Sequence, residues 1–353
     1  NGLNTAGFIS GYRGSPVGGY DQQLWNARKF LENNHIKFQP GLNEDLAASA
    51  IWGSQQTNLF EGGKYDGVFG IWYGKGPGVD RCGDVFKHGN MSGPSKHGGV
   101  LLIAGDDHAA KSSTVPHQSE FAFVDASIPV LNPAGVQEIL DYGVLGFEMS
   151  RFSGCWVAFK TTAENMDSSS SIDVSPNRIN IELPDFDMPA DGLHIRWPDD
   201  WIEQEHRLHN YKLNAVRAFA RANGIDKVVM DSSTAKLGIV TTGKSYLDVR
   251  QALEDLGITE EKADAIGIRL YKIGMPWPLE PMGVHEFAEG LEEILVIEEK
   301  RPLIENQLKE ELYNYPSNKR PRIVGKLDEK QQPLQSAAGV LTANQIASVI
   351  ASR

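Results

Sequence analysis

The chain has only two cysteines, Cys82 and Cys155, among its 353 residues. They form no Cys-x-x-Cys pair and stand in no cluster with histidine at metal-ligand spacing. We therefore do not expect a zinc site or an iron–sulfur cluster that is held by this chain alone. Both thiols are expected to be reduced and buried, as is usual in cytoplasmic proteins.

Long apolar runs and basic runs are also missing. No stretch approaches the roughly 20 apolar residues of a membrane-spanning helix, and the N-terminus lacks a signal-peptide pattern. We expect a soluble, cytoplasmic protein without a membrane partner. The chain carries 34 Lys and Arg against 46 Asp and Glu, a formal net charge of −12. Such a chain repels a phosphate backbone, so nucleic acid is not an expected partner.

The beginning and the length of the chain suggest a piece of a larger, multidomain protein. The first residue is not Met, and the apolar run Ala6–Ser10 follows almost at once, which indicates that upstream sequence has been removed. The length exceeds what one hydrophobic core usually serves, so two or more domains are expected.

Short apolar runs alternate with helical patterns in the first half of the chain, as in a doubly wound, mainly parallel α/β sheet. The expected strands are Ala6–Ser10, Gly67–Trp72, Val100–Ala104, Ile128–Leu131 and Trp156–Phe159, and the expected helices are Gly19–Asn33, Glu44–Phe60 and Gly135–Ser150. We assign residues 1–185 to this domain. Residues 186–235, with the amphipathic segment Asp199–Asn223, are predicted to be a linker with one helix.

Residues 236–325 repeat the alternation and predict a smaller α/β domain with a parallel sheet. Its expected strands are 237–243, Ala265–Ile273 and Glu293–Glu298, and its expected helices are Ser245–Leu256, Val284–Gly290 and Pro302–Tyr313. Residues 326–353 are expected to form an irregular tail that ends in a short helix, Thr342–Ser352.

Three loops follow expected strands of the first domain, where α/β folds place their ligands. The first, residues 10–21, has four glycines around Arg13 and Ser15. Glycine allows close approach of the backbone to a ligand, Arg13 offers a guanidinium for an anion, and Ser15 offers a hydroxyl. The loop lacks the Gly-Lys-Ser/Thr ending of a P-loop and is not a dinucleotide fingerprint. A purely structural glycine turn explains it equally well.

The second loop leads into an acidic helix start at Asn43, Glu44 and Asp45. Asn43 can cap the helix, and the two acids can stabilise its dipole by ~0.3–1 kcal/mol. Alternatively, the small residues at 47–49 leave space for a flat ring while Glu44 hydrogen-bonds it. Both interpretations are open at this point.

The third candidate region combines residues 72–90 with residues 104–123. It places Lys75, Arg81 and His117 in glycine-rich segments after strands. A serine hydrolase does not fit, because no Gly-x-Ser-x-Gly elbow is present, and the histidine spacing is not that of a zinc site. Cations near strand ends suit a small anionic substrate such as a carboxylate.

Together these segments resemble a known family. GYRGSP (11–16), GLNEDLAA (41–48), WYGKGPGVDRCGD (72–84) and AGDDHAAKSS (104–113) are similar to the N-terminal pyrimidine-binding domain of indolepyruvate:ferredoxin oxidoreductases, which depend on thiamine diphosphate. LGIVTTG, KIGMPWPLEP and ILVIEEKRPLIE in the second half resemble the transketolase C-terminal-like domain of the same family. The resemblance covers nearly the whole chain.

The resemblance implies oxidative decarboxylation of an aryl 2-oxoacid to an acyl-CoA, with coenzyme A and ferredoxin as further reactants. In such enzymes a glutamate hydrogen-bonds N1′ of the cofactor's aminopyrimidine, and by motif position this is Glu44. The bond favours the imino form at N4′, which takes the proton from the thiazolium ring. A glutamate with this task is expected to be partly buried and to have a raised pKa.

The resemblance also implies contacts in the first loop. Ser15 stands where related pyruvate oxidoreductases have a threonine near the substrate, in a Tyr-x-x-Thr-Pro setting. Serine keeps the hydroxyl and loses the methyl. Gly14 and Pro16, which flank Ser15, are expected to contact the cofactor.

The arginine that binds the substrate carboxylate in those enzymes has no clear counterpart. The corresponding stretch here begins with His117 and reads His-Gln-Ser-Glu. His117, Lys75, Arg81 and Arg13 are therefore the candidate substrate-binding residues.

Several parts of such an enzyme are missing from this sequence. No Gly-Asp-Gly motif for magnesium and the diphosphate is present, and the cysteines for [4Fe–4S] clusters are lacking. We expect a separate domain or subunit to hold Mg²⁺ and the diphosphate, the clusters to lie elsewhere in the full enzyme, and this piece to be inactive alone. A homodimer is expected from the resemblance. A non-catalytic dimerisation or regulatory lobe, or an oxidoreductase for another 2-oxoacid, are the alternatives.

Overall fold

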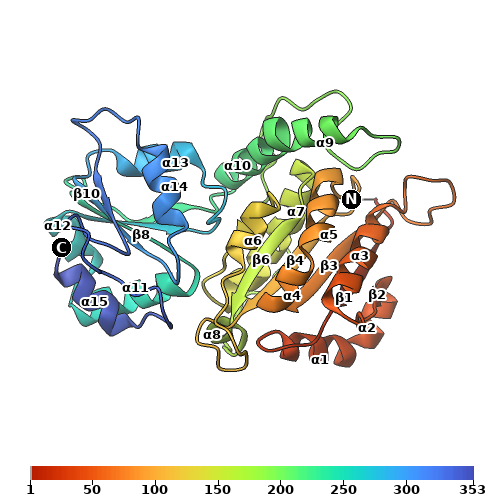
Figure 1. Ribbon diagram of the computed structural model, residues 1–353, viewed down its shortest axis with the longest axis horizontal. Helices are drawn as coiled ribbons and strands as arrows, with labels where there is room; N and C mark the ends of the chain where they lie inside the picture. Colours follow the sequence, from red (N-terminus) through yellow and green to blue (C-terminus); the bar gives the residue numbers. More distant parts are fainter. Residues whose placement is uncertain (1) are drawn as a thin grey trace. The chain divides into compact units, whose positions relative to one another are not determined.

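The computed structural model describes residues 2–353, which divide into two compact units (Figure 1). The first unit runs through Leu131 and continues over Val136–Asn223. The second comprises Gly224–Arg353 and the short loop Asn132–Gly135. The segment expected as a linker is shared, because its helices belong to the first unit and its last strand belongs to the second.

Six strands form the sheet of the first unit, in the order β2-β1-β3-β4-β6-β5. They are β1 (Thr5–Gly11), β2 (Ile36–Phe38), β3 (Gly67–Lys75), β4 (Val100–Asp106), β5 (Val130–Leu131) and β6 (Val157–Thr162). All of the pairings are parallel. The doubly wound parallel sheet is therefore confirmed, and its carboxyl ends lie along one edge.

Helices cover both faces of this sheet, as the alternating side chains of β3 show. They are α1 (Gly18–Asn26), α2 (Arg28–Asn33), α3 (Glu44–Gln55), α4 (Gly76–Arg81), α5 (Gly83–Ser92), α6 (Glu120–Asp125), α7 (Val136–Ser153) and α8 (Ala163–Met166). Trp72 packs edge-on against Phe86 of α5, with ring centroids 5.1 Å apart. Phe69, on the other face, packs against Phe147 of α7 at 5.3 Å. The central strands are therefore buried on both sides.

The amphipathic segment forms α9 (Trp201–Arg207), a π-helical turn η1 (Leu208–Lys212) and α10 (Leu213–Ala222), where one helix was expected. Lys212 is wholly buried in the π-turn, and its ammonium donates to the carbonyls of Asn90 at 3.2 Å and Met91 at 2.8 Å. These carbonyls end α5 and have no partner within their own helix. Burial lowers the pKa of Lys212 to about 8.

The second unit has a mixed sheet in the order β11-β10-β8-β9-β7. Its strands are β7 (Lys227–Met230), β8 (Leu237–Thr242), β9 (Ile268–Ile273), β10 (Glu293–Ile297) and β11 (Arg322–Val324). Its helices are α11 (Gly243–Asp255), α12 (Glu260–Ile266), α13 (Pro281–Ala288), α14 (Ile304–Glu311) and α15 (Ala343–Ala351). Only β7 is antiparallel to its neighbour. The expected tail packs on this sheet, because Ile346 and Ile350 of α15 lie in its core.

Some expected elements differ from the structure. The helix expected at Gly19–Asn33 is divided at Ala27, and the one expected at Glu44–Phe60 ends at Gln55. The strand expected from Ala265 begins at Ile268, because α12 runs to Ile266 and Gly267 ends it in a left-handed conformation (φ 81°). Over residues 2–353, no helix is both long and apolar enough to cross a membrane.

The close packing of β1 against β3 yields a first prediction. A β-carbon on Gly11 would lie 2.2 Å from the backbone oxygen of Tyr73, whereas one on Gly53 of α3 meets nothing within 4 Å. Gly11→Ala should therefore destabilise the protein by about 1–3 kcal/mol in urea unfolding. Gly53→Ala, the control, should stabilise it by roughly 0.5–1 kcal/mol. Equal stability of the two variants would contradict the packing described here.

Candidate active site

Glu44 is the first residue of α3 and is fixed by the backbone around it. Asn43 caps the helix, accepting from the amide of Leu46 at 2.8 Å. The indole nitrogen of Trp72 donates to the carbonyl of Glu44 at 3.0 Å. Glu44 is only 6 % exposed. Helix α3 therefore begins at Glu44, whose backbone is held by the Asn43 cap and by the buried indole of Trp72.

Two of the predicted loops meet at the carboxyl ends of β1 and β3. The amide of Gly41, in the loop before α3, donates to the carbonyl of Gly11 at 2.8 Å. The amide of Tyr12, which opens the first loop, donates to the carbonyl of Tyr73 at 3.0 Å. These bonds hold the start of the first loop and the approach to Glu44 on one edge of the sheet.

Two glycines let the backbone lie directly against the Glu44 side chain. A β-carbon on Gly78 of α4 would be 2.4 Å from Cγ and 2.8 Å from Oε1 of Glu44. One on Gly74 of β3 would be 3.4 Å from Cγ. Any larger residue at position 78 would displace the carboxylate. Glycine at this position is required by close approach rather than by a turn.

The carboxylate of Glu44 has little to bind within residues 2–353. Its one charged neighbour is Arg81, whose Nε lies 4.0 Å from Oε2 and whose side chain is 59 % exposed. In that described part of the chain, neither carboxylate oxygen receives a hydrogen bond. A nearly buried carboxylate with open lone pairs can accept a hydrogen bond from a ligand. Of the three small residues that were expected to leave space for a flat ring, Ala47 and Ala48 are fully buried in the protein instead, and Ser49 is half-buried.

The first loop has exposed polar residues, and it packs on the end of β4 through Pro16. Pro16 follows a cis peptide bond and lies against Gly105 at the end of β4. Ser15 and Arg13 are exposed, and Gly14 lies beside the side chain of Lys75. In the part of the chain that is described, Arg13 and Lys75 form no ion pair. Both cations are available to an anion.

His117 lies between two carboxylates. Its Nε2 is 2.8 Å from Asp80 of α4, and its Nδ1 is 3.7 Å from Asp106 at the end of β4. The ring packs on Gly76, where a β-carbon would be 2.2 Å from its Cγ and Nδ1. The side chain is 13 % exposed. Hydrogen bonding to Asp106 and then to Asp80 outweighs burial and raises the pKa of His117.

Asp106 anchors this cluster inside the protein. It accepts from the amide of Ser119 at 2.8 Å and from its hydroxyl at 2.5 Å. Lys160 of β6 lies 3.8 Å away and also pairs with Glu120. Burial alone would raise the pKa of Asp106, but His117, Lys160, the nearby His108 and Ser119 hold it well below its usual range.

Asp80 and Ser119 are site residues that the sequence reasoning did not single out, and Asp106 was noted only as one of the charged residues of segment 104–123. The only signal was the position of Asp106 directly after an apolar strand, in the segment Gly-Asp-Asp. The bond from His117 to Asp80 joins residues 37 positions apart and depends on the fold. The structure therefore brings together Glu44 with Arg81, Gly14 with Lys75, and His117 with Asp80, all on elements at the carboxyl edge of the sheet.

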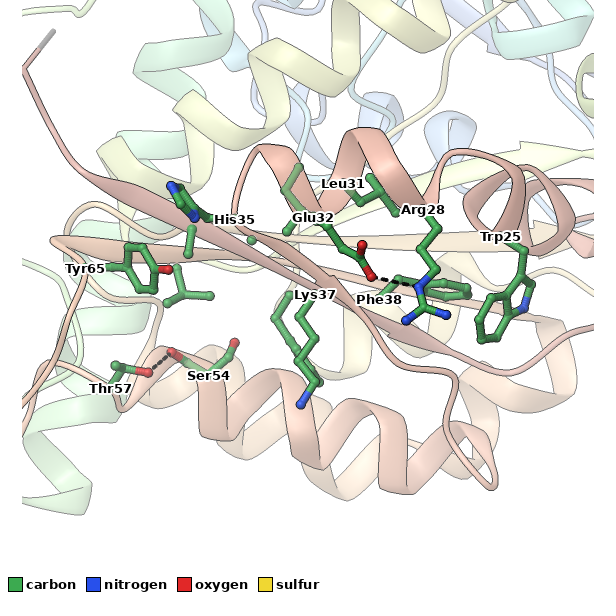
Figure 2. A pocket seen from close by; sticks show the side chains of 15 residues that line it. Trp25, Arg28, Leu31, Glu32, His35, Lys37, Phe38, Ser54, Thr57 and Tyr65 are labelled. Carbon is green, nitrogen blue, oxygen red and sulfur yellow. Dashed lines mark hydrogen bonds and ion pairs between the residues drawn. The ribbon is translucent and has the colours of Figure 1, made fainter.

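A separate pocket of about 730 Å³ surrounds edge strand β2 (Figure 2). Figure 2 shows Trp25, Arg28 and Phe38 on one side of the strand, while Lys37 points to the opposite side. Arg28 is paired with Glu32 at 2.7 Å. None of the predicted site residues lines this pocket. The site is therefore defined by the groups around Glu44 and not by the pocket at β2.

Known structures share the fold of this chain. A 2-oxoglutarate:ferredoxin oxidoreductase from Magnetococcus marinus, determined with 2-oxoglutarate, coenzyme A and succinyl-CoA bound, matches 98% of this chain and 62% of its own at a TM-score of 0.66 and 14% identity. A split-gene transketolase, an inactive β4 tetramer, matches 98% and 91% at a TM-score of 0.55 and 12% identity. The chain shares the α/β fold of these two proteins.

Sequence comparison finds relatives among the indolepyruvate oxidoreductases. Residues 227–353 match the indolepyruvate oxidoreductase domain. Indolepyruvate oxidoreductase subunit IorA of Pyrococcus abyssi (strain GE5 / Orsay) is 29% identical over 219 residues, which cover 60% of this chain and 32% of the relative. The same protein from Methanothermobacter marburgensis is 23% identical over 308 residues, covering 86% and 45%. The chain is similar to these IorA proteins, in agreement with the resemblance to indolepyruvate oxidoreductases. It spans about a third to just under half of the length of these curated relatives.

Cys82, at the end of α4 beside this site, yields a second prediction. Burial, and then the charges of Asp45 and Glu44, raise the pKa of Cys82 far above its usual range. Burial also raises the pKa of Cys155 to about 11. Because the thiolate is the reactive form, a thiol reagent at pH 8 should label neither cysteine of the folded chain and both in denaturant. Rapid labelling of Cys82 before unfolding would contradict the complete burial of its side chain.

Proposed function

We propose that this chain supplies the pyrimidine-side half of the active site of a thiamine-diphosphate-dependent 2-oxoacid oxidoreductase. Glu44 accepts a hydrogen bond from the protonated N1′ of the aminopyrimidine ring. The observation that carries the proposal is a glutamate side chain only 8 % exposed, at the carboxyl edge of a parallel sheet, with open carboxylate lone pairs in the described chain. An unpaired buried carboxylate is costly unless a ligand uses it.

The surroundings of Glu44 fit this role. When bound, thiamine diphosphate supplies the thiazolium carbon that adds to the keto carbon of the 2-oxoacid. Gly78 lies directly against the carboxylate of Glu44, and Gly74 lies beside its Cγ. Arg81 lies 4.0 Å from Oε2, which is too far for a hydrogen bond, so it leaves the lone pairs of Glu44 open. Glu44 can then share a proton with a ring nitrogen.

We assign the substrate carboxylate to the cations of the neighbouring loops. Lys75 and Arg13 form no ion pair in the described chain, and Arg81 is mostly exposed beside Glu44. Ser15, in the same first loop, offers its hydroxyl to the substrate, while Gly14 and Pro16 line the cofactor. His117 was the fourth candidate, but both of its ring nitrogens face carboxylates, which argues against direct contact with an anion.

The rest of the active site is assigned to other parts of the full enzyme. In residues 2–353 no group of three or more His, Cys, Asp or Glu side chains could hold a metal ion. Mg²⁺ and the diphosphate would bind a domain or subunit beyond this chain, as would the [4Fe–4S] clusters. The 2-oxoacid would be indolepyruvate or another aryl pyruvate, with coenzyme A and ferredoxin as reactants and a homodimer as the assembly.

The proposal predicts that Glu44→Gln lowers kcat of the full-length enzyme by roughly 10²–10⁴-fold, because a neutral amide cannot exchange a proton with N1′. Unfolding free energy should change by less than about 1 kcal/mol, since the side chain of Glu44 accepts no hydrogen bond within residues 2–353. Asp45→Asn, one residue further along the helix, is the matched control and should keep turnover.

Titration with labelled thiamine diphosphate separates this proposal from a non-catalytic lobe. Binding to the full-length protein should weaken in Glu44→Gln and not in Asp45→Asn. Turnover and binding of Glu44→Gln that equal the wild type would remove the basis of the proposal.

A further prediction concerns the substrate carboxylate. Lys75→Gln should raise KM by roughly 10–100-fold for indolepyruvate, phenylpyruvate and pyruvate alike, because all three share the carboxylate that the cation would bind. Lys87→Gln, which removes a surface lysine paired with Asp125 at 2.7 Å, is the control and should leave KM unchanged. A KM effect that is confined to the aryl substrates would assign Lys75 to the side chain of the substrate instead.

A further inference from the structure

Helix α4 lies between His117 and Glu44, and its residues contact the two in turn. Gly76 lies against the His117 ring, and Asp80 accepts from its Nε2 at 2.8 Å. Gly78 lies against the Glu44 carboxylate, and Arg81 is 4.0 Å from it. The backbone of α4 at Gly78 is the wall behind the Glu44 carboxylate. If His117 lets this six-residue helix shift, that wall moves with it.

The other side of His117 is fixed to the interior of the sheet. Asp106, which is 0 % exposed and ends β4, faces Nδ1 at 3.7 Å. Ser119 holds Asp106 with its amide and its hydroxyl and lies 3.5 Å from the same ring nitrogen. Asp80, by contrast, is 62 % exposed. His117 thus lies between the buried carboxylate of Asp106, which Ser119 holds in place, and the exposed Asp80 of α4.

Charge balance favours an imidazolium at this position. The buried carboxylates of the cluster are Asp106 and Glu120, and the buried ammonium is that of Lys160. A buried carboxylate without a matching cation is strongly unfavourable. Protonated His117 adds a positive charge to the cluster, which His108 also faces, and it can then donate from both ring nitrogens.

We propose that His117 is a positioning residue for Glu44, which clamps α4 to the end of β4 and so fixes the wall behind the Glu44 carboxylate. The consequence for catalysis rests on the proposed function of Glu44. The clamp itself rests only on the contacts of His117, Asp80 and Asp106.

The clamp has a defined pH dependence. The pKa of His117 is raised above its ordinary value, with hydrogen bonding to Asp106 as the largest cause and Asp80 next. A histidine with a raised pKa contributes stability that is fully present below its ordinary pKa and is lost as pH rises through the raised value. The other charged groups facing the cluster are Lys160 and Glu120, from β6 and α6, and His108 faces Asp106 from the loop after β4. Arg81 and Glu44 face α4 from its other side.

The test uses His117→Asn and Asp80→Asn in the full-length enzyme. Asn keeps a polar side chain at 117 but cannot titrate, and Asp80 is a surface residue whose change tests the clamp should His117→Asn fail to fold. The exposed pair His88 and Asp84, with Nδ1 and Oδ1 3.5 Å apart on α5, supplies the matched controls His88→Asn and Asp84→Asn. Hydrogen exchange of peptides covering residues 76–81, corrected for the intrinsic rate, is measured between pH 6 and pH 9 together with kcat and KM.

In the wild type and in both controls, protection of residues 76–81 should fall roughly tenfold as pH rises through the pKa of His117. Both test variants should lack this step and show the low protection throughout. Their kcat should fall by roughly tenfold, while KM for the 2-oxoacid stays within about twofold. A raised KM with unchanged kcat would overturn the proposal, because it would place His117 on the substrate. So would a step in protection that persists in both test variants.

The two proposals fail separately. If Glu44→Gln retains wild-type turnover, the role of Glu44 is lost, yet the exchange step still tests the clamp. If Glu44→Gln is inactive and the exchange step is the same in every variant, only the clamp is lost.

Discussion

The candidate site depends on two glycines whose backbone lies directly against the side chains of His117 and Glu44. Gly76 admits the ring of His117 and Gly78 admits the carboxylate of Glu44, each at a distance that no β-carbon tolerates. Because both glycines belong to one short helix, the acid and the imidazole contact the same element. The segment Gly-Lys-Gly-Pro-Gly is therefore a structural requirement of this edge of the sheet. Its glycines create contact and do not merely permit a turn.

The fold was largely predictable because its strands are buried on both faces and appear as continuous apolar runs. β4 and β6 were located this way, and so were β8 and β10. Edge strand β2 was not expected, since it is only three residues long and Lys37 separates its two apolar residues, Ile36 and Phe38. β7 was assigned to a linker because it is short and largely exposed. Short helices such as α4, built on glycine and proline, also lack a helical signal in the sequence.

The site was predictable in part. Glu44 could be singled out because an asparagine cap followed by two acids marks a helix start after a strand. Its open lone pairs depend on which residues fold against it, and no local pattern contains that information. The contact from His117 to Asp80 and Asp106 likewise joins segments that follow two different strands, β3 and β4. Local chemistry identifies candidate residues, whereas their pairing is a property of the topology.

The two outermost strands of the first sheet are very short, with three residues in β2 and two in β5. A strand of this length exposes few free amides and carbonyls, and Lys37 in the middle of β2 further discourages addition of another strand. The sheet is therefore poorly suited to grow sideways into a continuous intermolecular sheet. Any other polypeptide that joins this unit would have to dock on helices and loops, where side-chain complementarity selects the partner.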